Sequence, residues 1–179
     1  ELTQPRRMAQ LVVGGGCFWC VESGLNNLRG VSEVIPGYSG GETQDPTHQQ
    51  VCSGNTGHAE VVRVTFDEQT IPLNTLLEVF FTLHDPTQLN RQGADIGTQY
   101  RSVIFTADEQ QRITAEQVIE QCQTNFDNEI VTEISPLGHL YIAEDYHHDY
   151  YANNPNNPYC LSVVGPKVAK AKAKHASLY

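Results

Sequence analysis

Lysine is absent from the first 166 residues of the chain, and basic residues are scarce overall. The 11 Lys and Arg residues stand against 21 Asp and Glu residues, which gives a formal net charge of −10. Nucleic-acid binding needs basic side chains that neutralise phosphates, so this charge argues against a nucleic-acid-binding protein. All four lysines lie within residues 167–174, where they could contact RNA or anionic lipid. We interpret residues 169–179 instead as a solvated, frayed, basic C-terminal helix or tail.

Long apolar runs are missing as well. No segment has the roughly 20 apolar residues that a membrane-spanning helix needs. No charged-then-apolar leader with a small-residue cleavage site opens the chain, although a leader removed ahead of Glu1 would leave no trace. We therefore expect a cytoplasmic protein that does not associate with membranes.

Internal repeats, low-complexity segments and Ser/Gly linkers are absent too. This predicts a single domain over residues 1–179, with a core over about residues 9–168. Hydrophobic residues make up 39% of the chain, which is enough for a sizeable core. Nothing in the sequence indicates an obligate oligomer, so we expect a monomer.

The cysteine content does not fit a disulfide scaffold, because an odd number of cysteines occurs in a chain with a full-sized core. We expect reduced thiols, some of which take part in chemistry. The five cysteines are Cys17, Cys20, Cys52, Cys122 and Cys160. We interpret Cys52 and Cys122 as structural.

Hydrophobic periodicity predicts a loose alternation of strands and helices. Strands are expected over residues 9–13, 31–38, 60–66, 100–106 and 130–134. Helices are expected over residues 17–28, 73–83, 108–123 and 143–151. Several strands follow one another without a helix, which favours an α+β fold over a purely parallel sheet. Long loops often carry function, and irregular chain is expected over residues 37–59, 84–99 and 152–166.

Three glycines lead into Cys17, which stands at the expected start of a helix. Free N–H groups and the positive dipole end at a helix start favour an anion, so we expect a lowered Cys17 pKa and a nucleophilic sulfur. A buried, inert cysteine is the alternative. The adjacent Phe18 and Trp19 favour the nucleophile, because two aromatic rings can enclose a small apolar group such as a methyl.

Cys17 and Cys20 form a C-x-x-C pair, which is typical of a thioredoxin-like dithiol or of half a zinc site. A zinc site would need a second pair of ligands. The candidates for that pair have unconvincing spacing: Cys52 with His58, and His147 with His148. We therefore expect no metal.

Three further residues have side chains suited to thiol chemistry. Glu60 begins an apolar strand, where loss of water raises a carboxyl pKa and allows proton donation near neutral pH. Tyr100 ends a glycine-punctuated loop, from which its phenol can hydrogen-bond an oxyanion. Cys160 follows an Asn/Pro-rich segment, and we expect an exposed, mobile thiol that resolves an oxidised partner. Taken singly, the glutamate and the tyrosine are more often structural.

These segments, in this order, resemble the A-type peptide-methionine sulfoxide reductases over roughly residues 11–168. The matching segments are Gly16-Cys17-Phe18-Trp19, Gly37-Tyr38-Ser39-Gly40-Gly41, Cys52-Ser53-Gly54-Asn55-Thr56-Gly57-His58-Ala59-Glu60, His84-Asp85-Pro86, Arg91-Gln92-Gly93, Asp95, Gly97-Thr98-Gln99-Tyr100-Arg101-Ser102 and Ala143-Glu144-Asp145-Tyr146-His147. The resemblance implies a two-layer α/β plait with a mixed, largely antiparallel sheet and long irregular loops. It also implies reduction of methionine S-sulfoxide, free or in proteins, without a metal or a bound organic cofactor.

The resemblance further implies how the reaction proceeds. The Cys17 thiolate attacks the sulfoxide sulfur, Glu60 protonates the departing oxygen and Tyr100 helps to hold that oxygen. Phe18 and Trp19 enclose the substrate methyl. Methionine then leaves, and Cys17 is left as a sulfenic acid.

Regeneration is implied in the same way. Cys160 condenses with the sulfenic acid to form a disulfide, which thioredoxin reduces. Asp95 is expected to organise water or the substrate backbone. Cys20, where many members carry glycine, is an alternative resolving thiol. We favour Cys160, since a thiol on a loop moves more easily than one in a helix.

His48 is a departure from the family pattern, which commonly has a second oxygen-holding tyrosine at this position. A histidine can still donate a hydrogen bond there, but its charge changes near neutral pH. We keep two other functions open on the residues alone. One is a dithiol–disulfide oxidoreductase that uses Cys17 and Cys20, and the other is a non-catalytic zinc-binding or peptide-binding module.

Overall fold

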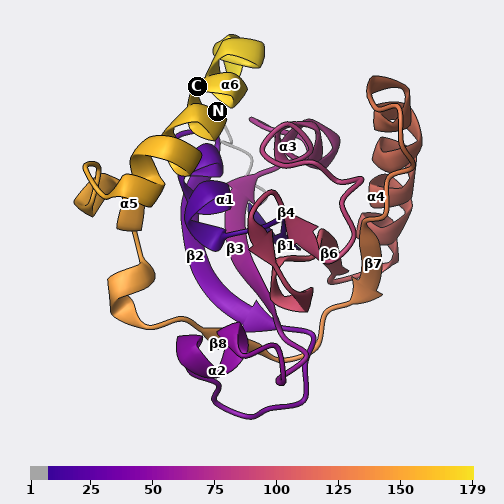
Figure 1. Cartoon of the computed structure of the whole chain (residues 1–179). Coiled ribbons are helices and arrows are strands. Elements are labelled where there is room, and N and C mark those ends of the chain that lie inside the picture. Colours follow the sequence, from indigo (N-terminus) through magenta and orange to yellow (C-terminus); the bar gives the residue numbers. More distant parts are fainter. Residues whose placement is uncertain (1–7) are drawn as a thin grey trace, which may run out of the picture.

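A six-stranded mixed sheet organises the computed structural model, which describes residues 8–179 (Figure 1). The strand order is β7-β6-β1-β3-β2-β8. All neighbouring strands are antiparallel except β6 and β7, which are parallel. The strands are β1 (Met8–Gly14), β2 (Val31–Ser39), β3 (Ala59–Asp67), β6 (Val103–Thr106), β7 (Glu133–Pro136) and β8 (Leu140–Ile142). The predicted mixed, largely antiparallel α+β sheet is confirmed.

Alternation along the strands separates two apolar clusters, because successive side chains in a strand point to opposite faces. Leu11 and Val13 of β1 belong to the larger cluster, together with buried side chains from the helices. Val12 belongs to the smaller cluster on the other face, with four buried residues of β3 and β6. The larger cluster is the main core, and the helices that contribute to it cover one face of the sheet (Figure 1).

The longer helices that contribute to that core are α1 (Phe18–Leu25), α3 (Leu73–Phe80), α4 (Glu109–Cys122) and α6 (Gly165–Lys174). The start of α4 is capped by Asp108, whose carboxylate accepts a hydrogen bond of 2.8 Å from the Gln111 N–H. α4 crosses over between β6 and β7, which is why these two strands run parallel. Both α1 and α3 are shorter than expected, ending at Leu25 and Phe80.

The predicted long loops contain more regular structure than expected. The 37–59 segment includes α2 (His48–Cys52), where the Thr47 and Gln50 side chains form a capping box. The 84–99 segment includes the hairpin of β4 (Arg91–Gln92) and β5 (Asp95–Ile96). Tyr100 does not begin a strand as predicted but ends a 3-10 turn over Thr98–Tyr100.

The C-terminal region differs most from the prediction. The expected helix over 143–151 is a 3-10 turn over Asp145–His147 followed by the short α5 (Tyr150–Asn153). A π-helix over Cys160–Val164 then runs directly into α6.

The interpretation of residues 169–179 as a solvated, frayed tail is wrong. Ala171 of α6 is fully buried in the main core. The terminal Tyr179 hydroxyl donates a hydrogen bond of 2.5 Å to the Gly24 carbonyl of α1. Apolar residues between the lysines therefore attach this helix to the core, while most of its lysines face outward. In residues 8–179, no helix combines the length and the apolar character that crossing a membrane requires.

Candidate active site

A glycine turn between β1 and α1 places Cys17 at the start of the helix. Gly16 has a φ of +86°, a left-handed conformation that glycine adopts without strain. A Cβ atom on Gly15 would lie 2.8 Å from the ring of His84, so a larger residue does not fit there. Cys17 itself is the N-cap of α1 and is 8% exposed. The predicted position of Cys17 at the start of a helix is confirmed.

The predicted fall of the Cys17 pKa is wrong. Burial raises the pKa of Cys17 well above its ordinary value, and a hydrogen bond with Cys20 and the Glu60 carboxylate act in the same direction. Its hydrogen bond with the Trp19 backbone N–H lowers the pKa, but by less. The loss of water around the Cys17 thiol therefore outweighs the favourable effect of the helix start on its thiolate.

Cys20 is the thiol that Cys17 contacts. It lies on the first turn of α1, is fully buried and shares a side-chain hydrogen bond with Cys17. That hydrogen bond lowers the pKa of Cys20, and the positive charge of Lys167 on α6 adds to the effect against the cost of burial. Of the two thiols of the C-x-x-C pair, Cys20 is therefore the one whose thiolate is stabilised.

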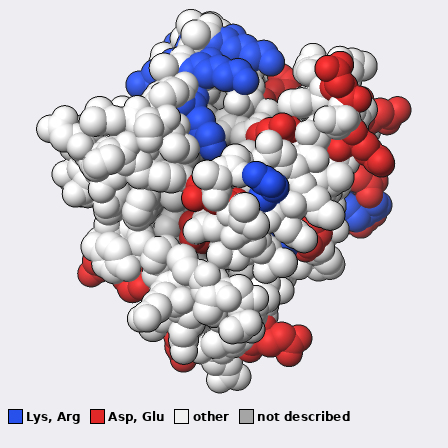
Figure 2. All heavy atoms as spheres, viewed as in Figure 1, with Lys and Arg blue, Asp and Glu red and all other residues white. Residues whose placement is uncertain are grey.

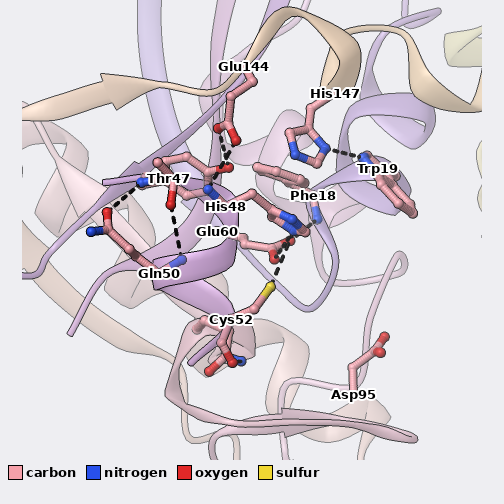
Figure 3. Close-up of polar contacts among 12 residues, drawn as sticks. Phe18, Trp19, Thr47, His48, Gln50, Cys52, Glu60, Asp95, Glu144 and His147 are labelled. Atoms are coloured by element: carbon pink, nitrogen blue, oxygen red, sulfur yellow. Dashed lines mark hydrogen bonds and ion pairs between the residues drawn. The ribbon is translucent and has the colours of Figure 1, made fainter. Parts of the chain in front are cut away.

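Glu60 lies on β3, opposite the start of α1. Its side chain is 1% exposed, and its Oε1 accepts a hydrogen bond of 3.1 Å from the Phe18 N–H (Figure 3). Burial raises the pKa of Glu60, although the Phe18 N–H and the nearby His48 partly oppose this. The predicted rise is confirmed, and a carboxyl group that keeps its proton to higher pH can act as an acid.

His48 contributes the second polar wall of the site. Its Nε2 lies 3.6 Å from Oε2 of Glu60, and its side chain is 28% exposed. The His48 N–H donates a hydrogen bond of 3.1 Å to one carboxylate oxygen of Glu144. The other oxygen of Glu144 accepts a hydrogen bond of 2.9 Å from the buried Tyr38 hydroxyl. Glu144 thus fixes the first residue of α2 to the sheet, which positions His48 toward Glu60 (Figure 3).

The aromatic wall is made by Trp19 and not by Phe18. The Trp19 ring stacks on Tyr150 with centroids 3.7 Å apart, and its Nε1 donates a hydrogen bond of 3.0 Å to Nδ1 of His147. Phe18 is 1% exposed and packs against the rings of His48 and His147. Phe18 does not line the cavity next to Cys17, and its contact with a substrate methyl stays a prediction.

Six of the predicted residues line a cavity of about 340 Å³, together with two residues that were not predicted. Its lining comprises Cys17, Trp19, His48, Glu60, Asp95, Tyr100, Asn157 and Tyr159. Burial raises the pKa of Tyr100, as do Glu60 and the other acidic groups around it, so its phenol remains a hydrogen-bond donor. A buried thiol, a carboxylic acid and a phenol thus face one space.

Asp95 has a specific partner at this cavity. Its Oδ2 accepts a hydrogen bond of 2.5 Å from the Tyr159 hydroxyl, across 64 positions in sequence. Tyr159 also shares a side-chain hydrogen bond with Cys20. Sequence reasoning missed Tyr159 and Asn157, since neither residue carries a local motif; the one signal was their position just before Cys160.

Cys160 is not exposed on a mobile loop, so that expectation is wrong. Its side chain is fully buried in the main core, at the first residue of the π-helix. Cys20 lies close enough to raise the pKa of Cys160, after the larger effect of burial. The predicted resolving thiol thus lies within electrostatic range of Cys20, the other candidate.

Two further thiols and the His58 imidazole lie outside this cavity. Cys122 is buried in the core as predicted, whereas Cys52 is exposed at the end of α2. His58 is no partner for Cys52, because it uses both ring nitrogens on a loop. Its Nδ1 accepts from the Gly41 N–H at 3.0 Å, and its Nε2 lies 2.7 Å from the Thr43 carbonyl.

A larger cavity of about 630 Å³ adjoins the site, since Asp95 and Tyr159 line both. Lys167, Lys170 and Lys174 of α6 line its far side. Figure 2 shows basic side chains gathered along the upper rim of a hollow on this face, with acidic side chains mostly elsewhere. The lysines therefore give one side of the approach to Cys17 a local positive charge on an acidic protein.

Comparison with known proteins identifies this arrangement. The family model described as peptide methionine sulfoxide reductase matches residues 9–178. The chain belongs to this family. A peptide methionine sulfoxide reductase MsrA from Deinococcus radiodurans is 52% identical over 173 residues, which cover 95% of this chain and 84% of the relative. Family membership decides against the dithiol oxidoreductase and the zinc-binding or peptide-binding module.

Solved structures of this reductase family have the same fold. Reduced Mxr1 from Saccharomyces cerevisiae matches with a TM-score of 0.81 and 32% identity, over 89% of this chain and 92% of that one. The same yeast protein in complex with Trx2 matches with a TM-score of 0.58 and 22% identity, over 84% and 89% of the chains. The two-layer α/β architecture is therefore that of a methionine sulfoxide reductase.

Proposed function

We propose that the cavity around Cys17 carries the methionine sulfoxide reductase activity, with Cys17 as nucleophile and Glu60 as proton donor. The supporting observation is that Glu60, buried and with a raised pKa, is tied through the Phe18 N–H to the residue that follows Cys17. The Cys17 sulfur attacks the sulfoxide sulfur, and the Glu60 proton passes to the sulfoxide oxygen. Oxygen ends on Cys17 as a sulfenic acid, so Cys17 is oxidised by two electrons and methionine leaves reduced.

The oxygen is held by hydrogen-bond donors on two sides. Tyr100 lines the cavity as a neutral phenol, and His48 lines it beside Glu60. Donors fixed before the reaction stabilise charge as it develops on the oxygen. Trp19 faces the same cavity and encloses the methyl group. Asp95 acts by holding Tyr159 in the wall, which extends its predicted role as an organiser.

Cys20 is the first resolving thiol in this proposal, because it already contacts Cys17. The Cys20 sulfur attacks the Cys17 sulfenic acid, a disulfide forms and the oxygen leaves as water. The argument that a helical thiol moves poorly does not apply, since Cys17 is the N-cap and no helix has to unwind. Cys160 then attacks Cys20, which forms a Cys20–Cys160 disulfide and releases the Cys17 thiolate.

A thioredoxin supplies the two electrons that complete the cycle. The related yeast Mxr1 forms a complex with Trx2, which supports a reductant of this class. Cys20 and Cys160 are fully buried, so the segment around Cys160 has to open before a second protein reaches this disulfide. We also propose a single catalytic domain over residues 1–179 that works as a monomer in the cytoplasm, on free or protein-bound methionine S-sulfoxide.

Turnover of the two separated sulfoxide epimers tests the activity. The wild-type chain should reduce the S epimer with thioredoxin and leave the R epimer, and Cys17→Ser should abolish turnover. Peptide mass mapping after one turnover tests the resolving order. A Cys17–Cys20 disulfide should accumulate in Cys160→Ser, whereas a direct Cys17–Cys160 disulfide in the wild-type chain would contradict the order proposed here.

A further inference from the structure

Three potential metal ligands converge on one wall of the active site. The Nε2 of His48, the Sγ of Cys52 and a carboxylate oxygen of Glu60 all lie within 4.8 Å of one another. Figure 3 shows the three side chains gathered together, with dashed contacts from the His48 ring to Cys52 and to Glu60. The reaction described above uses His48 and Glu60 but leaves the Cys52 thiol without a role.

We propose that His48, Cys52 and Glu60 form a Zn²⁺ site through which zinc reversibly inhibits the enzyme. Tetrahedral zinc with bonds of about 2.0–2.3 Å places its ligand atoms roughly 3.3–3.8 Å apart. The His48 nitrogen lies 3.4 Å from the Cys52 sulfur and 3.6 Å from a Glu60 oxygen. Two edges of the tetrahedron therefore already exist, and small side-chain rotations would complete the third.

The donor set suits zinc in type and in charge. Imidazole, thiolate and carboxylate are all zinc ligands, and a neutral imidazole with two anionic ligands balances a divalent ion. His48 and Cys52 stand four residues apart on α2, and the same spacing on a helix presents two ligands to one metal in known zinc enzymes. Binding requires Cys52 to release its proton to solvent.

The ligands are held in place before any metal arrives. The capping box of Thr47 and Gln50 fixes the start of α2, and Glu144 accepts the His48 N–H. Glu60 is fixed from the other side by the Phe18 N–H. A site whose ligands are already ordered loses little entropy on binding, which favours affinity.

Inhibition follows from the place of the metal. His48 and Glu60 line the catalytic cavity together with Cys17, so a zinc ion held by them would lie at the wall of that cavity. A carboxylate bound to zinc can neither carry nor deliver the proton that the sulfoxide oxygen needs. This consequence rests on the proposed role of Glu60, whereas metal binding itself does not.

Zn²⁺ titration and Co²⁺ spectroscopy on the full reduced chain, kept reduced with a phosphine, test the site without turnover. The wild-type chain should bind one Co²⁺ with a thiolate charge-transfer band that Zn²⁺ removes. Cys52→Ser and His48→Tyr should each weaken binding by at least the roughly 10–100-fold that the loss of an outer-shell partner costs. Cys122→Ser removes a distant buried thiol and should bind as the wild type does.

The Cys17–Cys20 dithiol is the competing site, so the Cys17→Ser/Cys20→Ser double variant decides between them. It should keep the Co²⁺ band, and loss of the band there would overturn the proposal, as would unchanged binding in Cys52→Ser. Activity assays then test inhibition: Zn²⁺ should stop the wild type, a chelator should restore it, and Cys52→Ser should stay active at zinc concentrations that stop the wild type. If zinc binds through Cys52 and turnover continues, the proposed inhibition is overturned. If the wild type shows no turnover even without zinc, the proposed function is rejected instead.

Discussion

The Phe18 N–H donates a hydrogen bond of 3.1 Å to the Glu60 carboxylate, across 42 positions in sequence. The bond joins the first residue of α1, next to Cys17, to the strand that carries the acid. Because Glu60 is 1% exposed, this single N–H is one of the few groups that stabilise its ionised form. The distance between nucleophile and acid is therefore set by the backbone and not by flexible side chains.

Replacement of Glu60 by glutamine should lower the rate of sulfoxide reduction by roughly 10²–10⁴-fold, the usual contribution of a positioned acid. The pH profile should also change. With a raised pKa, Glu60 holds its proton below that pKa, so wild-type activity falls as pH rises through it, while the Cys17 thiolate increases. Glu60→Gln has no such proton to lose, so its residual rate should only rise with pH in single-turnover kinetics.

Glu22→Gln is the matched control for that measurement. Glu22 is also 1% exposed, but it lies on α1 away from the cavity and accepts a hydrogen bond of 3.1 Å from the Asp149 N–H. Its removal should leave the pH profile of turnover unchanged. A Glu60→Gln profile that still falls at high pH would show that another group supplies the proton.

Glu22 gives a separate prediction about stability. Burial raises its pKa to about 7 from an ordinary value of 4.5. Between these two values the folded protein binds the proton more tightly than the unfolded chain, so this group's contribution to stability decreases as pH rises from about 4.5 to 7. Glu22→Gln should therefore gain stability relative to wild type over this window, by up to about 3 kcal/mol. Urea unfolding at pH 4.5 and pH 8 measures it, and the exposed Glu68→Gln should show no such trend.

The local parts of the active site could be predicted from the sequence. The glycine turn before Cys17 and the buried start of β3 at Glu60 are encoded by neighbouring residues, so periodicity and turn chemistry were enough. The rise of the Glu60 pKa followed from the same burial. The direction of the Cys17 pKa shift did not follow from neighbouring residues, because it depends on burial and on the thiol of Cys20 and the carboxylate of Glu60.

Long-range packing explains the errors. Cys160 follows a segment rich in Asn and Pro, which is typical of an exposed loop, but the helix after it is anchored by Val168 and Ala171. The π-helix is drawn into the core with that helix, and Cys160 becomes buried. The hydrogen bond between Tyr159 and Asp95 could not be predicted either, because nothing in the sequence around one residue indicates the other.

Substitution of His48 by the tyrosine that is common at its position should change the pH dependence of turnover. His48, whose Nε2 lies 3.6 Å from a Glu60 oxygen, lowers the pKa of Glu60 and so weakens the acid. Without this imidazole the pKa of Glu60 should rise, so the fall of activity at high pH should begin at a higher pH in His48→Tyr. Steady-state rates across pH on the S epimer measure this, and two profiles that overlay would remove His48 from the reaction.

Gly16→Ala should destabilise the fold and disturb the nucleophile together. At a φ of +86° an alanine costs about 1–2 kcal/mol, and its Cβ would lie 2.8 Å from the Gln92 side chain. Urea unfolding and sulfoxide turnover should both report the change. Gly138→Ala is the matched control, because a Cβ there meets nothing within 4 Å. Equal stability of the two variants would show that the turn does not need a left-handed residue.

Lys167→Met should slow recycling without slowing sulfoxide reduction. The Lys167 charge lowers the pKa of Cys20, and a thiol of lower pKa is a better leaving group when a disulfide is reduced. Loss of this charge should slow the reaction of thioredoxin with the oxidised enzyme by roughly threefold for each unit by which the pKa of Cys20 rises. The burst of methionine formed in the first turnover should keep its rate, since Cys20 acts after that step.

Lys172→Met separates this effect from a general loss of positive charge on α6. Lys172 lies on the same helix but faces the Tyr179 ring, 5.9 Å from its centroid, and does not line the cavity beside Cys20. Stopped-flow reduction of each oxidised variant by thioredoxin makes the comparison. If both variants slow equally, the lysines act by attracting the acidic surface of a partner, and the leaving-group explanation for Lys167 fails. If only Lys167→Met slows, the effect requires a positive charge near Cys20, which indicates that Cys20 is the leaving group when thioredoxin reduces the disulfide.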